Sequence, residues 1–171
     1  GILIALSAVY FLSEKRKRRK VVVSTIALIL CCILGYSDSF AFWQKDLTYE
    51  GESVYNYLQV SETDKRVVLS TNVLFGVQSV YMKEDALTGM YYDYAMAAPL
   101  MVSGKEAKDA SMLILGMGTG TYAVQCEKYF GNENIEGVEI DEKITDLSRK
   151  YFSLPESVKV TTYDGRAFLH A

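Results

Sequence analysis

Three closely spaced glycines and an acidic residue form the part of the chain best suited to chemistry. Gly116, Gly118 and Gly120 directly follow the apolar segment 112–115, and Glu139 ends a second apolar run 23 residues after Gly116. Glycines let backbone approach a ligand closely, and a carboxylate at a strand end can accept hydrogen bonds from both hydroxyls of a ribose. The spacing predicts a nucleotide-like ligand. The alternatives are glycines that serve packing and an acid that is only solvated.

Asp164 is a further candidate, because it follows a third predicted strand at 158–161. An acid there can accept a hydrogen bond from an adenine amino group, or it can cap the next helix, and its position favours neither. The glycine turn is not a Walker loop, since no Lys-Ser or Lys-Thr follows it. It also lacks the later glycine of the dinucleotide fingerprint, where Thr121 and Tyr122 stand.

The run from Met90 to Tyr94 contains three tyrosines and Asp93. Such a group can hold an amine by cation–π contact and by charge attraction. The alternative is ordinary packing of tyrosines at the start of a helix.

Composition excludes several kinds of site. Three cysteines are too few and too unevenly spaced for a disulfide framework, and His170 alone supports neither a zinc site nor a Ser-His-Asp triad. We therefore expect no metal. Six of the 18 basic residues lie at 15–20, which leaves the part after residue 36 strongly acidic and argues against nucleic acid as a partner.

These candidates must be positioned by secondary structure, and residues 104–171 alternate strands with helices. The pattern predicts strands at 112–115, 135–140 and 158–161, and helices at 119–130, at 141–152 and from 164 onward. Gly131 is expected just past the end of the first helix, and Asp141 is expected to cap the start of the second. This order is typical of the first half of a doubly wound, Rossmann-like sheet of methyltransferase type, here incomplete. Residues 44–103 predict a small antiparallel β-region with strands at 54–60, 67–70 and 73–80, and then a helix at 91–102 that Pro99 interrupts.

Residues 1–43 predict transmembrane segments. An uncharged stretch at 1–12 precedes a basic loop at 13–20, and residues 21–42 are almost free of charge and end in aromatic residues. We interpret 21–42 as a transmembrane helix; a buried core helix and a signal peptide are the alternatives. We expect a multi-pass protein of the bacterial cell membrane, with the sequence cut at both ends. The fold class is then α/β, preceded by membrane segments.

In this order the motifs resemble the spermidine/spermine synthase (polyamine aminopropyltransferase) family, in a membrane-attached bacterial form. The matching segments are Glu52–Tyr57, Val68–Ser70, Gln78–Ser79, Tyr91–Asp93, Leu113–Gly120, Val138–Asp141 and Tyr163–Leu169. The resemblance implies a small β-domain ahead of a methyltransferase-like domain. It also implies a transferase of polyamine biosynthesis that moves an aminopropyl group from decarboxylated S-adenosylmethionine to putrescine or a related amine.

The resemblance also implies site residues. Those expected to bind the adenosyl donor are Gly116, Gly118, Thr119, Gly120, Glu139, Ile140, Asp164, Gly165 and Gln78, with Glu139 on the ribose and Asp164 on the adenine. Gln78, Tyr91 and Asp93 are expected to line the channel for the aminopropyl group and the amine. The family's catalytic Asp would lie beyond Ala171, so the segment alone is expected to be inactive. The resemblance is compatible with a homodimer.

One position departs from the family pattern. The family carries an Asp where this chain has Thr119, and that Asp contacts the amine of the aminopropyl donor. Two alternatives follow: a methyltransferase that uses ordinary S-adenosylmethionine, or a catalytically inactive adenosyl-ligand-binding domain of a membrane protein.

Overall fold

The computed structural model describes residues 9, 18–35, 44–71, 76–102, 104 and 106–171. The chain divides into two compact units, Gly1–Phe42 and Trp43–Ala171. Each unit is described by itself.

In the first unit, the described residues form one long helix, α2 (Arg18–Leu34). The predicted transmembrane segments are wrong: among the described residues, no helix is long and apolar enough to cross a membrane. The physical reason is length, since 17 residues at about 1.5 Å each span roughly 26 Å, less than the hydrocarbon core, and the first three residues are basic. The predicted multi-pass membrane location is therefore wrong as well. Residues 36–42, and 1–12 apart from position 9, lie outside the described residues.

The second unit begins with a four-stranded antiparallel sheet. Its strands are β1 (Leu47–Glu52), β2 (Tyr57–Glu62), β3 (Arg66–Ser70) and β4 (Val77–Met82), and they lie in sequence order. The antiparallel β-region is therefore confirmed, but the first strand was not expected, and β2 starts three residues later than predicted. The sequence of β1, Leu-Thr-Tyr-Glu-Gly-Glu, carries too few apolar residues to alternate clearly.

The predicted helix at 91–102 is instead two short helical segments. Helix α3 (Tyr91–Ala95) ends before a 3₁₀ segment, η2 (Ala98–Met101), which has Pro99 in its first turn. Proline cannot donate a backbone hydrogen bond and is tolerated mainly in the first turn of a helix, so the chain ends one helix and begins another. A second 3₁₀ segment, η3 (Ala107–Asp109), leads into the next sheet.

The remaining residues form three parallel strands with helices between them. The strands are β5 (Met112–Leu115), β6 (Ile135–Glu139) and β7 (Lys159–Thr162), and the helices are α4 (Thr121–Phe130), α5 (Glu142–Tyr151) and α6 (Gly165–Phe168). The predicted α/β, Rossmann-like arrangement is thus confirmed. Gly131 ends α4 in the left-handed conformation, and the Asp141 side chain caps α5, as the sequence predicts.

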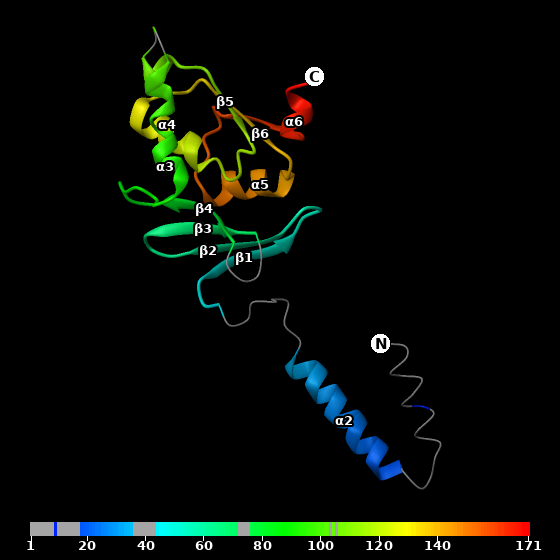
Figure 1. Cartoon of the computed structure of the whole chain (residues 1–171). Coiled ribbons are helices and arrows are strands. Elements are labelled where there is room, and N and C mark those ends of the chain that lie inside the picture. The colour runs from blue at the N-terminus through cyan, green and yellow to red at the C-terminus, as the bar shows by residue number, and fades with distance from the viewer. Residues whose placement is uncertain (1–8, 10–17, 36–43, 72–75, 103, 105) are drawn as a thin grey trace. The chain divides into compact units, whose positions relative to one another are not determined.

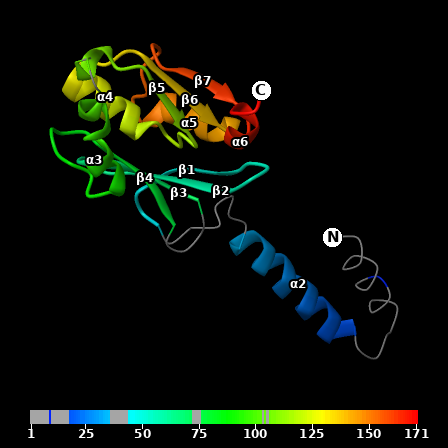
Figure 2. The same ribbon diagram turned by 45° about the horizontal axis from the view of Figure 1, so that its top comes forward.

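Helix α5 holds the two sheets together. Leu58, Val60, Val67 and Leu69 of the antiparallel sheet form one buried cluster with residues of α5 and the loop after it: Ile144, Leu147 and Phe152. Figures 1 and 2 show α5 between the antiparallel sheet and the parallel strands. This packing brings the β1–β2 turn and strand β4 close to the residues that follow the parallel strands.

Candidate functional site

The glycine turn after β5 requires glycine at each of its three positions. Gly116, Gly118 and Gly120 have φ angles of 68°, 60° and 72°, in the left-handed region. The N–H groups of Gly116 and Met117 both donate to the carbonyl of Val138, at 2.9 and 3.0 Å. At Gly118 a Cβ atom would lie 3.1 Å from Gln78 Nε2 of β4, so the turn also allows the two sheets to approach.

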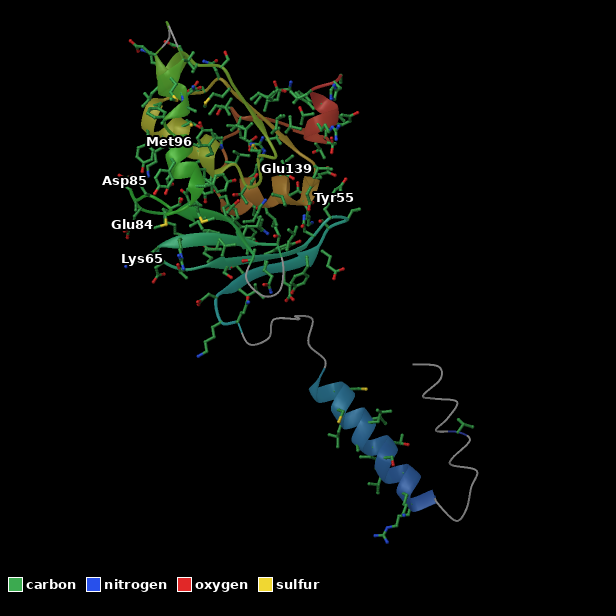
Figure 3. All side chains as sticks on the ribbon, in the orientation of Figure 1. Tyr55, Lys65, Glu84, Asp85, Met96 and Glu139 are labelled. Atoms are coloured by element: carbon green, nitrogen blue, oxygen red, sulfur yellow. The ribbon has the colours of Figure 1, made fainter. Side chains whose placement is uncertain are left out.

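Glu139 lies at the end of β6, directly beside this turn (Figure 3). Its side chain is only 6% exposed, and both of its carboxylate oxygens accept backbone hydrogen bonds: Oε2 from Gly118 N at 2.7 Å and Oε1 from Asp141 N at 3.0 Å. The acid therefore fixes the shape of the glycine turn. Each oxygen keeps a second lone pair, so the carboxylate can still accept from a ligand.

Asp141 is a buried acid that the sequence predicts only as a helix cap. Its Oδ1 accepts from Lys143 N at 3.1 Å, which is the cap, while Oδ2 accepts from Ser53 Oγ at 2.5 Å and from Asn56 Nδ2 at 3.2 Å. Ser53 and Asn56 belong to the β1–β2 turn. Asp141 thus joins this turn to α5. No local signal reveals the connection, because the partners are more than 80 residues apart.

A cavity of about 190 Å³ adjoins the glycine turn. It contains four of the predicted site residues: Gln78, Tyr91, Gly116 and Gly118. The other residues that line it are Ser79, Tyr92, Ala95, Ile114, Leu115, Met117, Thr121 and Tyr122. Of these, Tyr92 belongs to the tyrosine-rich run but is not among the predicted site residues.

Asp93, which is expected to line the amine channel, accepts hydrogen bonds at the start of α3 instead of lining the cavity beside the glycine turn. Its carboxylate accepts from Thr88 Oγ1 at 2.8 Å, Gly89 N at 2.7 Å and Gln125 Nε2 at 2.8 Å, and it does not line the cavity beside the glycine turn. Burial raises the pKa of Asp93, but the donors Gln125, Thr88 and Gly89 together lower it below its ordinary value. The side chain organises the start of α3, and its predicted contact with an amine stays a prediction.

Ile140 lines a second cavity, whereas Asp164 and Gly165, which follow β7, do not. This open cavity of about 630 Å³ is lined by Glu52–Tyr55, Ile140–Lys143, Asp146 and Thr162. Figure 3 marks Tyr55 at the tip of the β1–β2 turn. Asp164 caps α6, with Oδ1 accepting from Ala167 N at 2.7 Å, and a Cβ atom on Gly165 would lie 3.5 Å from Leu115 Cβ.

Thr119 and Gly120 lie inside the protein. Thr119 is fully buried, and its hydroxyl pairs with that of Thr121 at 3.1 Å. Gly120 packs against Leu154, where a Cβ atom would come within 2.5 Å of Leu154 Cδ1. Neither residue lines the cavity beside the turn. Within the described residues, no cluster of His, Cys, Asp and Glu is arranged to hold a metal ion.

Comparison with known proteins gives a close relative. The chain is 55% identical over 163 residues to a probable polyamine aminopropyl transferase of Bifidobacterium longum. The resemblance to the aminopropyltransferase family is confirmed. The match covers 95% of this chain and 36% of that aminopropyltransferase, so the chain spans about a third of its relative's length. No protein-family model matches the chain.

A solved structure supports the fold. The crystal structure of a probable spermidine synthase from Corynebacterium glutamicum superposes with a TM-score of 0.59 at 22% identity. The superposition covers 70% of this chain and 46% of the spermidine synthase. At this identity the likeness concerns the fold alone.

Proposed function

We propose that the full-length protein carrying this chain is a polyamine aminopropyltransferase that uses decarboxylated S-adenosylmethionine and putrescine or a related amine. The observation that carries the proposal is the 55% identity to a probable polyamine aminopropyl transferase over 95% of the chain. The geometry supports it, because the glycine turn, Glu139 and a cavity lined by Gln78 and Tyr91 lie side by side.

The reaction is a direct displacement. The neutral amine attacks the methylene next to the sulfonium, a C–N bond forms as the C–S bond breaks, and the thioether methylthioadenosine leaves with the electron pair. The new ammonium then loses a proton to a base. The described part of the chain contributes orientation, which lowers the barrier by holding the two reactants in line. The base expected from the resemblance lies beyond Ala171.

The adenosyl group would be held by residues that already have internal partners. Glu139 would accept the ribose hydroxyls with its remaining lone pairs, while Gly118 N and Asp141 N keep it in place. Asp164 would receive the adenine amino group on Oδ2, because Oδ1 accepts from Ala167 N. Ile140 and Gly165 would lie along the nucleoside.

The buried Thr119 favours one second candidate, a methyltransferase that uses ordinary S-adenosylmethionine. A neutral threonine replaces the family's acid, so the turn presents no carboxylate for the amine of a decarboxylated donor. The two functions differ in the group transferred and share the adenosyl site.

Calorimetry on the full-length protein with methylthioadenosine, S-adenosylmethionine and the decarboxylated donor tests the adenosyl site. A product assay with putrescine then separates the two reactions. Binding of methylthioadenosine together with aminopropyl transfer is the expected result. If none of the three ligands binds, both functions are refuted.

Substitution of Glu139 by Gln tests the ribose contact. The amide replaces one accepting oxygen with a donor, so we expect affinity for all three ligands to fall about tenfold to a hundredfold. Glu136→Gln is the matched control, because Glu136 lies on the same strand and its carboxylate pairs with Lys159 at the surface. Unchanged affinity in Glu139→Gln would contradict the assignment.

A further inference from the structure

The cavity of about 190 Å³ beside the glycine turn is lined, among the described residues, by no acidic or basic side chain. Its polar lining consists of the Gln78 amide and the hydroxyls of Ser79, Thr121 and three tyrosines. A charged group that enters the cavity therefore meets neutral donors and acceptors from this part of the chain. A hydroxyl can receive either charge, because it has one hydrogen to donate and two lone pairs to accept.

Three of these hydroxyls already donate their hydrogen within the protein. The Tyr92 hydroxyl donates to Val80 O at 3.0 Å, and it accepts from Val80 N at 2.8 Å. The Tyr122 hydroxyl donates to a backbone carbonyl of α3 at 3.0 Å, and Ser79 Oγ donates to Gln78 Oε1 at 3.2 Å. These groups keep no hydrogen for a carboxylate that enters the cavity.

Thr121 carries the remaining buried hydroxyl. This residue is 4% exposed, whereas Tyr91, which carries the other, is 75% exposed. Burial raises the pKa of Tyr92 and a hydrogen bond with the Thr121 side chain opposes this rise, so the two hydroxyls are neighbours. Thr121 also lines a smaller cavity of about 50 Å³, but Tyr92 lines only the one beside the glycine turn. The Thr121 hydroxyl is therefore assigned to the larger cavity.

Thr119 lies behind this hydroxyl and can exchange its direction. The two Oγ1 atoms are 3.1 Å apart, and Thr119 is fully buried and outside the cavity lining. One hydrogen lies between the two oxygens, and either residue can supply it. When Thr121 donates it, the lone pairs of Thr121 can accept from an ammonium. When Thr119 donates it, the hydrogen of Thr121 can be donated to a carboxylate.

Gly118 connects the hydroxyl pair with the proposed adenosyl site. Its N–H donates to Glu139 at 2.7 Å, and the same residue lines the cavity. A chain that leaves a ribose held by Glu139 can therefore pass the turn and enter the cavity. The decarboxylated donor carries only an ammonium at the end of that chain, whereas ordinary S-adenosylmethionine carries an ammonium and a carboxylate.

We propose that Thr121, oriented by Thr119, receives the charged end of the sulfonium donor and serves the ammonium of one donor and the carboxylate of the other. This inference rests on the proposed adenosyl site. It makes Thr121 a specificity-determining residue that admits both donors. A carboxylate side chain in its place would serve the ammonium alone, since it has no hydrogen to donate.

Calorimetry on the full-length protein tests this with the two donors and with methylthioadenosine, which has neither an ammonium nor a carboxylate. We expect the wild type to bind the two donors with affinities within about tenfold of each other. Thr121→Val removes the hydroxyl at nearly constant volume, so affinity for both donors should fall about tenfold to a hundredfold, and affinity for methylthioadenosine should change much less. Thr121→Ser should restore most of the lost affinity.

Thr121→Asp separates the two charges. The new carboxylate attracts the ammonium and repels the carboxylate of ordinary S-adenosylmethionine, so the affinity ratio should shift toward the decarboxylated donor by about tenfold or more. Thr145→Val is the matched control, because it makes the same isosteric change on α5, outside the cavity lining. It should leave the affinities for all three ligands unchanged.

Different outcomes refute different statements. If the wild type binds none of the three ligands, the proposed function is refuted, and the inference with it. If it binds methylthioadenosine, three results overturn the inference alone: a preference for one donor above about tenfold, unchanged donor affinities in Thr121→Val, or an unchanged ratio in Thr121→Asp. Thermal unfolding and methylthioadenosine binding report whether each variant is folded. If Thr121→Val does not fold, Thr121→Ala replaces it, and unchanged donor affinities there also overturn the inference.

Discussion

Removing the Asp141 carboxylate should destabilise the protein more than any other single acid on α5. The side chain is 2% exposed and accepts three hydrogen bonds, from Ser53 Oγ, Asn56 Nδ2 and Lys143 N. Asp141→Ala leaves all three donors without this acceptor. It also separates the β1–β2 turn from α5.

The expected cost follows from these contacts. A hydrogen bond to a charged group contributes about 1.5–3 kcal/mol, and a lost N-cap costs about 1 kcal/mol. The three bonds do not add fully, because Ser53 and Asn56 are only partly buried and water can reach their donors after the change. We therefore expect Asp141→Ala to lower the free energy of unfolding by about 3–5 kcal/mol.

Denaturant unfolding of the full-length protein measures this cost. Asp141→Asn should lose about 1–2 kcal/mol, because asparagine still caps the helix but turns a donor toward Asn56. Asp146→Ala, an exposed position on the same helix, is the control and should change stability by less than about 0.5 kcal/mol. If Asp141→Ala is no less stable than Asp146→Ala, the three hydrogen bonds do not hold the β1–β2 turn and the reasoning is refuted.

Three further changes test the packing around the site. Gly120→Ala should lower the free energy of unfolding by about 2–4 kcal/mol, since a Cβ atom would lie 2.5 Å from Leu154 and φ is 72°. Gly131→Ala, where φ is 66° and the space is open, should lower it by only about 1–2 kcal/mol. Equal losses in denaturant unfolding would contradict the predicted overlap at Gly120. Asn132→Ala removes a fully buried amide that donates to two backbone carbonyls and accepts from one N–H. We therefore expect the free energy of unfolding to fall by about 2–4 kcal/mol in the same assay. A loss below about 1 kcal/mol would contradict this account. Burial raises the pKa of Cys126 from 9.0 to about 11, so the folded protein keeps a proton that the unfolded chain releases, and stability should fall as the pH rises from 9 to 11. Cys126→Ala should remove that part of the pH dependence, and an identical pH profile would refute it.

The sequence predicts the parallel half of the fold well because its signals are local. Gly131 ends α4 and Asp141 begins α5 through bonds within a few residues of each position. Each signal acts on the backbone beside it, so no knowledge of distant partners is needed. Strand β1 was not predicted because its signal is not local. Its formation depends on pairing with β2 more than on its own apolar pattern.

The candidate site is predicted less completely, because its side chains are set by partners far along the chain. Asp93 is recognised as a candidate amine contact, yet three donors, including Gln125 from α4, already surround it. The position of Tyr92 beside the cavity depends on hydrogen bonds to Val80, which lies on another element. Residue type and local spacing therefore identify which groups could act, while the tertiary contacts decide which of them face a cavity.

The membrane prediction fails for a related reason. An apolar run predicts a spanning helix only if a helix of sufficient length covers it, and the described helix α2 has 17 residues, from Arg18 to Leu34. Hydropathy alone does not place the end of a helix.

Glu139 shows how much the internal partners of a site residue matter. From the sequence the choice is between a ribose ligand and a solvated acid, but the buried carboxylate is neither free nor solvated, because it accepts from Gly118 N and Asp141 N. These bonds fix its rotamer before a ligand arrives, so a ribose would bind a preorganised acceptor. They also link the acid to the glycine turn on one side and, through Asp141, to the β1–β2 turn on the other. Replacing Glu139 by Ala would therefore remove both acceptors that fix the turn together with the ligand contact. The isosteric Gln keeps one oxygen for one of the two backbone N–H groups and turns an amide donor toward the other, so it perturbs the turn less than Ala does.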